Sequence, residues 1–599
     1  MKTFSHSILA TLCCYSTLAS AQQEAIKEIV VTAARSAQTV DETLASVTVI
    51  DRQDIERSQA TTVAEVIQKT PGVSITNAGG LGKSTGVYLR GTAAKDLLVL
   101  IDGIRVGSAT LGQVAFEELN LSQVERIEIV RGPRSSLYGS DAAGGVIQIF
   151  TRKGAKKFTP SLSVSAGSDQ TRSANLNVRG GNETLWYSLG ASAVSTDGFD
   201  AKIGDDDDKD GYKNQGAHFR VGSYLEGGHQ VETFFSMTDS DNEYDGWTNQ
   251  ADALSKVLGV RGLVSLTDNW ALNITAGRSW DKTKNSSNGV FSSAFNTQRD
   301  SISLQNDIHL GSNMLIAGVD LQRDKVESSN DYAEGSRLNK AIFAQYMLMA
   351  GSSDVEFSLR ADDNEQFGTH TTGGVAWGIP INDRIRFAAS YATAFKAPSF
   401  NDLYYPYGGN PDLVPEESDT FELSLKGEYA QVNWQAALYQ TRFDNMIAWT
   451  PDAGGNWTPS NVNEARIRGL ELEAGYQLND WLFSGNVALL DPEVSSGINK
   501  GNRLQRRASQ ILNLNVDRQL EAFSFGATLH AENRRYTSDA NTDHLGGFGT
   551  VDLRAAYRLT PEWLVKAKVA NLLDKGYQTA KDYNQPGTEF LLTLAYQPR

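Results

Sequence analysis

From about residue 158 to the end of the chain, hydrophobic and polar side chains alternate with a period of two. The apolar residues Leu162, Val164 and Ala166, for example, are separated by serines. Because successive side chains of a strand point to opposite faces, this alternation predicts β-strands with one apolar and one polar face. The last strand is predicted over 589–596, where every second residue is apolar. We find no helical pattern in this region.

The alternation continues for more than 400 residues without a domain break. A soluble β-sandwich has the same period, but such domains rarely exceed about 250 residues. Residues 154–599 are 446 in number, which at about 20 residues per strand and connection gives about 22 strands. We therefore predict a transmembrane β-barrel of about 22 antiparallel strands over 154–599, with its apolar face toward lipid.

The preceding region reads as a compact α/β unit. Apolar residues at helical spacing predict a helix over 61–69, and short strands are predicted over 87–89 and 97–101. A domain of this length is about 35 Å across, and barrels of about 22 strands enclose a lumen that holds a plug. We predict that residues 34–153 form an N-terminal α/β plug domain inside the lumen.

The first 21 residues have the pattern of a secretory signal peptide. A cation at Lys2 is followed by an apolar run over 8–18 and by the small residues of 19–21. Both cysteines of the chain, Cys13 and Cys14, lie inside this peptide. The mature chain is therefore expected to contain neither disulfides nor thiol chemistry.

Charge and motif content exclude several functions. Without the signal peptide, 54 basic residues stand against 71 acidic ones, a net charge of about −17, so nucleic acid is a poor partner. The seven histidines form no pair at metal-binding spacing, and the chain has no G-x-S-x-G nucleophile motif. We therefore expect no enzymatic activity and no catalytic cofactor.

A β-prone hexapeptide at 28–33 follows the signal peptide closely. Ile29, Val30, Val31 and Thr32 are all β-branched, which favours an extended backbone with unpaired edges. Such a free strand is suited to pairing with a partner by strand addition, although it is also compatible with the first strand of a domain. We expect it to become a strand only when a partner supplies the other edge.

The densest charge run contains four aspartates at 205–208, followed by Asp210 and Gly211. It imitates the start of an EF-hand loop, but the twelfth position is Ala217, so an EF-hand is rejected. Crowded carboxylates repel one another unless a hard cation lies between them. A solvated acidic face and a calcium site between loops both remain open.

Three arginines of the plug, Arg126, Arg131 and Arg134, lie in a segment with few acidic residues. Glu471 and Glu473 lie on the polar face of a predicted barrel strand. Guanidinium groups pair well with carboxylates. We therefore predict that Arg131 and Arg134 face carboxylates of the barrel wall.

Several motifs occur in a fixed order along the chain: 28–33, Leu89-Arg90-Gly91, 99–103, 124–134, Tyr138-Gly139-Ser140, 395–398, Gly409-Asn410-Pro411 and 570–574. With these motifs the mature chain resembles the TonB-dependent outer-membrane transporters, and among them the cobalamin (vitamin B12) receptors. The resemblance implies a monomeric protein of the bacterial outer membrane, in contact with its lipid and lipopolysaccharide. It also implies active import of cobalamin, energised by the partner protein TonB.

The resemblance further implies three sets of site residues. The TonB-binding segment, or Ton box, comprises Glu28, Ile29, Val30, Val31, Thr32 and Ala33. Structural calcium ions are expected in loops that carry Asp200, Asp208, Asp210, Tyr244, Asp245 and Asp252. Cobalamin contacts are expected from Asn77, Ser84, Thr85, Leu111, Arg535 and Tyr557.

Three alternative functions remain at this stage. A transporter of ferric siderophores would have the same architecture and a different ligand. A passive porin or an adhesin barrel would lack the plug. A secreted carbohydrate-active enzyme would use the tryptophans and paired carboxylates of the chain and would be extractable without detergent.

Overall fold

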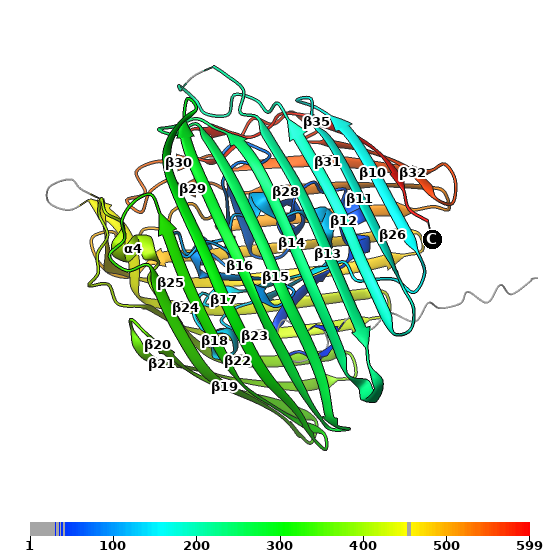
Figure 1. Cartoon of the computed structure of the whole chain (residues 1–599), viewed down its shortest axis with the longest axis vertical. Coiled ribbons are helices and arrows are strands. Elements are labelled where there is room, and N and C mark those ends of the chain that lie inside the picture. Colours follow the sequence, from blue (N-terminus) through cyan, green and yellow to red (C-terminus); the bar gives the residue numbers. More distant parts are fainter. Residues whose placement is uncertain are drawn as a thin grey trace, which may run out of the picture.

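A closed barrel of 22 antiparallel strands surrounds an N-terminal α/β unit (Figure 1). The computed structural model describes residues 30–31, 35, 38–39, 42–205, 207–451 and 457–598. Each barrel strand pairs with its neighbours in chain order, and the first strand pairs with the last, with Leu162 opposite Tyr596 and Ala166 opposite Leu592. Closure leaves no exposed strand edge, which a barrel within lipid requires. The predicted fold class is confirmed.

The barrel strands are long, as a tilted span of a membrane requires. They are β10 (Thr159–Gly167), β11 (Arg172–Gly181), β12 (Leu185–Thr196), β13 (Tyr212–Tyr224), β14 (Gln230–Glu243), β15 (Gln250–Thr267), β16 (Trp270–Ser287), β17 (Val290–Leu310), β18 (Asn313–Ser328), β19 (Ser336–Ala350), β20 (Ser353–Asn364), β21 (Gly368–Asn382), β22 (Ile385–Lys396), β23 (Glu416–Tyr429), β24 (Val432–Pro451), β25 (Trp457–Leu478), β26 (Trp481–Val494), β27 (Gln510–Gln519), β28 (Phe523–Glu532), β31 (Phe548–Arg558), β32 (Trp563–Ala570) and β35 (Glu589–Tyr596).

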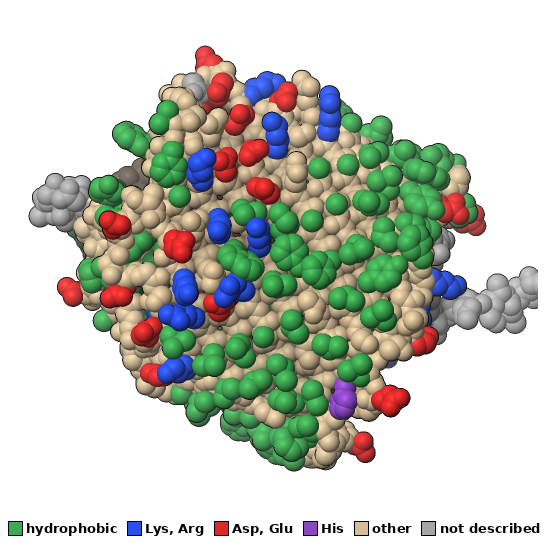
Figure 2. All heavy atoms as spheres, viewed as in Figure 1, with side chains coloured by type: hydrophobic (Ala, Val, Ile, Leu, Met, Phe, Trp, Pro, Cys, Tyr) green, Lys and Arg blue, Asp and Glu red, His purple; other side chains and the backbone are tan. Residues whose placement is uncertain are grey.

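The two faces of the barrel wall differ as the alternation predicts. Outward-facing Leu162, Val164 and Leu176 are exposed, and hydrophobic side chains cover much of the outer surface (Figure 2). Inward-facing positions of the same wall carry polar side chains such as Asn177 and His218, which are buried. Among the described residues, no helix has the length and hydrophobicity needed to cross a membrane.

The two ends of the barrel carry different connections. At the end where β10 follows the N-terminal unit, the turns are short, for example 268–269, 311–312 and 351–352. We call this the short-turn end. The opposite end, which we call the loop end, carries long connections, among them 197–211 and 571–588.

The unit inside the lumen is the plug (Figure 1). Its sheet has the order β3-β8-β9-β6-β7, with β6 and β9 parallel and the other pairs antiparallel. Its elements are β3 (Ser46–Ile50), α1 (Arg52–Ser58), α2 (Val63–Ile67), β4 (Val73–Asn77), β5 (Thr85–Leu89), β6 (Leu97–Ile101), β7 (Ile104–Arg105), β8 (Val124–Arg131), α3 (Ser135–Tyr138) and β9 (Gly145–Thr151). The plug strands end at Thr151 and the barrel begins at Thr159.

Local sequence explains the first plug helices. The side chain of Asp51 accepts from the backbone N–H of Asp54 at the start of α1, and Thr62 caps α2 in the same way through Glu65. Helix α2 is shorter than the predicted helix over 61–69. The apolar faces of both helices pack on the sheet, where Ile127 and Ile147 are fully buried.

One buried ion-pair network joins the plug to β13. Arg220 of the wall lies 2.7 Å from Asp102 of the plug, measured from Nη1 to Oδ1, and 2.9 Å from Glu232 of β14, from Nη2 to Oε1. The side chains of Arg220 and Asp102 are fully buried. Burying a charge is costly without a partner, so each of these groups depends on the others.

A second network joins the plug to β23 and β25. Arg90 pairs with Glu422 at 2.6 Å and with Glu471 at 2.9 Å, and Arg131 pairs with Glu473 at 3.3 Å. The prediction that Arg131 faces barrel carboxylates is therefore confirmed.

The other two arginines of the predicted cluster have different surroundings. Arg134 donates to the Pro133 carbonyl at 2.9 Å, and burial lowers its pKa while the barrel carboxylates Glu356 and Glu422 raise it. The two barrel carboxylates therefore attract the Arg134 guanidinium electrostatically. Among the residues that the structure describes, Arg134 makes no ion pair within 4 Å. Arg126 pairs with Glu128 of its own strand at 2.7 Å.

We predict that Arg220→Met lowers the stability of the plug by about 3–5 kcal/mol, because it leaves Asp102 buried without its cation. The measurement is urea unfolding of the plug, followed by limited proteolysis while the barrel stays folded. Lys156→Met is the control, since the Lys156–Glu183 pair is highly exposed and is expected to contribute less than about 1 kcal/mol. Equal midpoints for the two variants would contradict the prediction.

Candidate functional site

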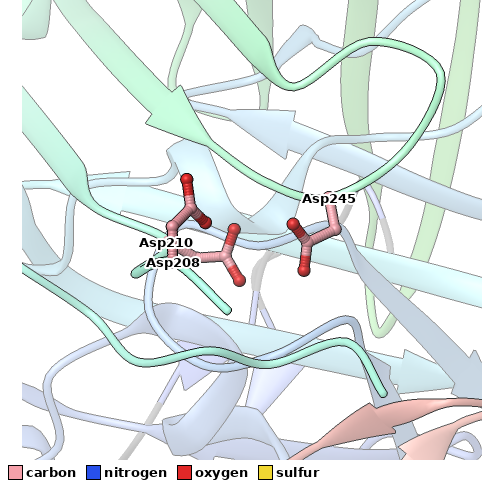
Figure 3. Close-up of side chains that lie close together, drawn as sticks. All are labelled: Asp208, Asp210 and Asp245. Carbon is pink, nitrogen blue, oxygen red and sulfur yellow. The ribbon is translucent and has the colours of Figure 1, made fainter. Parts of the chain in front are cut away.

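Two neighbouring connections at the loop end bring three aspartates together. Asp208 and Asp210 lie in the connection 197–211, and Asp245 lies in the connection 244–249. One carboxylate oxygen of each lies within 4.8 Å of the others. Asp210 and Asp245 are buried, and Asp208 is exposed. Figure 3 shows the carboxylates of Asp208 and Asp245 pointing toward one another across the space between the connections.

A third connection holds the first of these loops in place. The N–H of Ile203 donates to the Asp582 carbonyl at 2.8 Å, and the N–H of Asn584 donates to the Ala201 carbonyl at 2.8 Å. The N–H of Ala201 also donates to Oδ2 of Asp210 at 3.2 Å. Backbone pairing between 197–211 and 571–588 therefore orients Asp210 toward the cluster.

The donor set suits a hard cation. Calcium binds carboxylate oxygens in flexible geometries, and the three carboxylates come from two loops that an ion would bridge. The other three residues predicted for this site are not members of the three-aspartate cluster, although Asp200 and Tyr244 belong to the same two connections. Asp200 is exposed, the hydroxyl of Tyr244 lies 2.7 Å from Oγ1 of Thr248, and Asp252 pairs with Lys284 on the outer surface at 3.3 Å.

A lysine of the plug lies against the aspartate cluster. Nζ of Lys83 donates to the Gly211 carbonyl at 3.1 Å and to Oδ1 of Asn242 at 2.7 Å, and the side chain is buried. The pKa of Lys83 is lowered to about 8, because the effect of burial exceeds the opposing attraction of Asp210 and Asp245. Sequence reasoning missed this residue, because its partners lie more than a hundred residues away along the chain.

The turn between β4 and β5 forms the plug apex, which we define as residues 78–84. The side-chain amide of Asn77 donates to the Gly80 carbonyl and to Oγ1 of Thr85, each at 3.0 Å. Gly82 has a φ of +78°, and a Cβ there would lie 2.2 Å from the ring of Tyr212. Glycine therefore permits the apex to approach the barrel wall.

The predicted ligand residues of the plug are placed differently from one another. Asn77 and Thr85 are occupied in shaping the apex, and Thr85 is buried. Ser84 of the apex is exposed, and Leu111, in the turn after β7, is 57% exposed. Ser84 and Leu111 are therefore the two plug residues of this set that are exposed.

The two barrel residues of the predicted ligand set do not line a common surface. Arg535 is buried, pairs with Glu532, and donates to the Ile75 carbonyl of the plug at 2.8 Å. Tyr557 lies three positions after inward-facing Arg554, on the opposite face of β31, and is 50% exposed near the short-turn end. The prediction for Tyr557 is wrong, because it is an outer-surface aromatic of the kind that lines a membrane interface.

The plug does not fill the lumen. One cavity of about 560 Å³ is lined by Arg105, Tyr138 and Asp320, among other residues. A second cavity of about 530 Å³ extends between the helices α1 and α2 and the wall, and its lining includes Leu81 of the apex and His530. Both cavities have mixed polar and apolar linings, so small polar molecules and water are compatible with them.

The N-terminal segment is attached to the wall. Strand β1 (Val30–Val31) pairs antiparallel with β2 (Gln38–Thr39). Arg35 pairs with Asp320 of β18 at 2.7 Å, and its guanidinium lies 4.1 Å from the ring centre of Phe343 and 4.7 Å from that of Tyr138.

This arrangement differs from the expectation that the hexapeptide is extended only with a partner, because β2 supplies an edge from the same chain. The predicted signal peptide, 1–21, and the Ton-box residues Glu28, Ile29, Thr32 and Ala33 lie outside the described residues.

Comparisons with known proteins agree with this architecture. A family model described as "TonB dependent receptor-like, beta-barrel" matches residues 130–572, and one described as "TonB-dependent Receptor Plug Domain" matches residues 39–146. The "Vitamin B12 transporter BtuB" of Photobacterium profundum is 33% identical over 608 residues, covering 100% of both chains. The protein of the same name from Vibrio vulnificus is 30% identical, covering 95% of each.

Solved structures share the fold at lower identity. The ferric enterobactin receptor PfeA from Pseudomonas aeruginosa, solved as a mutant, has a TM-score of 0.80 at 19% identity, covering 95% of this chain and 100% of that chain. The siderophore receptor PirA from Acinetobacter baumannii has a TM-score of 0.78 at 19% identity, covering 92% and 98%. Because the barrel model alone matches most of the chain and the relatives extend over its full length, the chain belongs to the TonB-dependent receptors, plugged β-barrels of the bacterial outer membrane.

Proposed function

We propose that this receptor imports cobalamin across the outer membrane. The observation that carries the proposal is the full-length similarity, at 33% identity, to a protein named as a vitamin B12 transporter. The cluster of Asp208, Asp210 and Asp245 at the loop end supports it, because it supplies a means of organising loops around a bulky ligand.

We further propose that Asp208, Asp210 and Asp245 hold a structural calcium ion. A bound calcium would neutralise the carboxylates and link the connection 197–211 to the connection 244–249. The backbone bonds to 571–588 already restrain the first connection. Loops held in one arrangement lose less conformational entropy when they close over a ligand, which raises affinity.

The plug apex is the proposed floor of the ligand site. Ser84 and Leu111 offer one hydroxyl and one apolar side chain at accessible positions of the plug. Lys83 joins the apex to the connection 197–211 through its bond to Gly211, and to the end of β14 through its bond to Asn242. A change at the loops is therefore transmitted to the plug through direct contacts.

At the N-terminal side, residues 28–33 are proposed to add a strand to TonB. The pairing of β1 with β2 spans two residues on each side, so it is weaker than a longer pairing with a partner. TonB would exchange this short internal edge for its own. Arg35, paired with Asp320, is the first described attachment to the barrel wall after that segment.

A ferric siderophore is the second candidate ligand. Solved proteins with the same fold are named as siderophore receptors, but at 19% identity they show the fold alone. The porin and adhesin alternatives required an open barrel, whereas a plug occupies this lumen (Figure 1).

We predict that the purified receptor binds cyanocobalamin and that calcium chelation weakens this binding at least tenfold, or by about 1.4 kcal/mol. The measurement is an equilibrium titration in detergent with calcium and with a chelator, and ferric enterobactin is the comparison ligand. Binding of the iron chelate alone would overturn the cobalamin assignment. Cobalamin binding that is equal with and without chelator would overturn the calcium role only.

We predict that deleting residues 28–33 abolishes cobalamin uptake by cells and changes cobalamin affinity by less than about twofold. Val30→Pro is expected to abolish uptake as well, because proline cannot donate a ladder hydrogen bond. Val30→Ile keeps the β propensity of the segment and serves as the matched control. Normal uptake by the deletion variant would refute the coupling role.

We predict that Lys83→Met raises the calcium affinity of the loops roughly tenfold, because it removes a buried cation beside Asp210 and Asp245. Isothermal titration with calcium measures the change. Lys213→Met is charge-matched and alters an exposed residue of β13, so it is expected to leave the affinity within about twofold. An unchanged or lower affinity in the Lys83 variant would show that the lysine does not oppose the ion.

A further inference from the structure

The cavity of about 560 Å³ between plug and wall has a surplus of cations on its loop-end side. Strand β22 ends on that side at Lys396, and β19 begins there at Ser336. The basic residues that line this part form what we call the basic cluster: Arg105, Arg299, Arg337 and Lys396. The acidic residues beside them are Asp141 and Asp324. Four cations against two acids is an unusual ratio in a chain with a formal net charge of −16.

The basic cluster lies where the wall meets the plug. Arg299 is opposite Asp324, and Asp324 is opposite Arg337, so these three residues form one row across β17, β18 and β19. Lys396 approaches the plug turn after β7, where a Cβ on Gly112 would lie 3.6 Å from its Nζ. The cluster therefore spans the gap between the wall and this turn of the plug.

The two acids of this region are already used by some of the cations. Asp141 accepts from Nζ of Lys396 at 2.6 Å and from Nη1 of Arg105 at 3.3 Å. Asp324 accepts from Nε and Nη2 of Arg299 at 2.7 and 3.3 Å. The two carboxylates therefore neutralise at most two of the four positive charges.

Arg337 keeps its charge without a counterion. Among the described residues it makes no ion pair within 4 Å, and of its nitrogens only Nη1 donates a hydrogen bond, to the Pro398 carbonyl at 2.8 Å. Its guanidinium lies 5.0 Å from the ring centre of Phe400 and 5.8 Å from that of Phe367. These contacts orient the guanidinium and leave Nε and Nη2 available to a ligand.

Lys396 is a second donor that is only partly used. It is 3% exposed, and its ammonium, which has three N–H groups, donates to Asp141 alone within the described part of the chain. The next acids along the cavity do not supply the missing negative charge, because Asp320 and Asp362 pair with Arg360.

Water alone would also hydrate these cations. Two features favour an anion instead. The cluster is enclosed between plug and wall, where like charges repel one another more strongly than in bulk water. Its unpaired charge is a guanidinium, whose fork of donors matches the oxygens of a phosphate or a carboxylate better than a monatomic anion.

We propose that the basic cluster binds an oxyanion of the phosphate class, with Arg337 and Lys396 donating to its oxygens. Two sources supply this chemistry. One is free inorganic phosphate, which would occupy the cluster whatever ligand the receptor imports. The other is the phosphodiester of cobalamin, in which case the inference rests on the proposed function and gives the cluster a part in ligand selection.

The first arm of the test titrates the full-length receptor in detergent with inorganic phosphate, at fixed ionic strength in a phosphate-free buffer. Arg337→Gln removes the unpaired cation without leaving a carboxylate unpaired, and when free phosphate is the ligand it is expected to weaken phosphate binding by about tenfold or more. The control Arg534→Gln makes the same substitution at an exposed position of the loop end and is expected to stay within about twofold of the parent. Heat-modifiable migration of each variant verifies that its barrel is folded.

The second arm compares cyanocobalamin with cobinamide, which has the same corrin ring and no phosphodiester. When the phosphodiester is the ligand, Arg337→Gln is expected to lower the affinity for cyanocobalamin by about tenfold or more and the affinity for cobinamide by less than about twofold. Phosphate binding that is absent from the parent or unchanged in the variant, together with an equal effect on both corrinoids, would overturn the proposal. A parent that binds neither corrinoid would refute the proposed function and the second source, whereas phosphate binding that depends on Arg337 would still support the site.

Discussion

The closure of the barrel between β10 and β35 is the constraint on which the rest of the structure depends. In lipid, an unpaired strand edge would leave a row of backbone groups without hydrogen bonds, at a cost of several kcal/mol for each group. Pairing over Leu162 to Gly167 removes that edge. A closed wall has an inside and an outside, and strict alternation then assigns every strand residue to lipid or to lumen. The apolar outer face and the polar lumen both follow from this assignment.

A polar lumen in turn determines how the plug is held. Hydrophobic contact between plug and wall is limited by the polar inner face, so specific ion pairs take over that role, with Arg220 and Asp102 on one side and Arg90 and Glu471 on the other. Buried ion pairs add little net stability compared with apolar contacts. Removing one partner is costly, because the other charge then stays buried without compensation. Such contacts fix one orientation of the plug, and they leave polar cavities between the plug and the wall. A plug held in this way has a single orientation in the lumen.

The architecture was predictable because the period of two extends over more than 400 residues and only a barrel accommodates it. The side-chain sites were less predictable. Three of the predicted aspartates lie close together in the loops. Asp252 does not join them, because it belongs to β15, which begins at Gln250, and faces outward there. The sequence did not show where this strand begins, so Asp252 was assigned to a loop. Tyr557 also faces outward, because it lies an odd number of positions after inward-facing Arg554 on β31. Arg535 was placed in the correct part of the fold, yet its guanidinium is used to hold the plug. Lys83 depends on contacts more than a hundred residues distant in sequence, which no local pattern reports.

The plug sheet places its edge strand next to the N-terminal segment. Strand β3 is an edge strand that pairs only with β8, and its first residue, Ser46, lies opposite Arg131. Oγ of Ser46 donates to Glu422 at 2.5 Å, and Glu422 also accepts from Arg90. A pull on the chain before β3 therefore loads the ion-pair network directly. Hydrogen bonds to charged groups contribute about 1.5–3 kcal/mol each, and removing one partner of a buried ion pair costs more. The wall also holds the chain directly before β3, because Nζ of Lys426 donates to the carbonyls of Thr43 and Ala45 at 2.8 and 2.9 Å. A pull on the N-terminal segment therefore reaches β23 of the wall before it reaches Asp102 and Arg220.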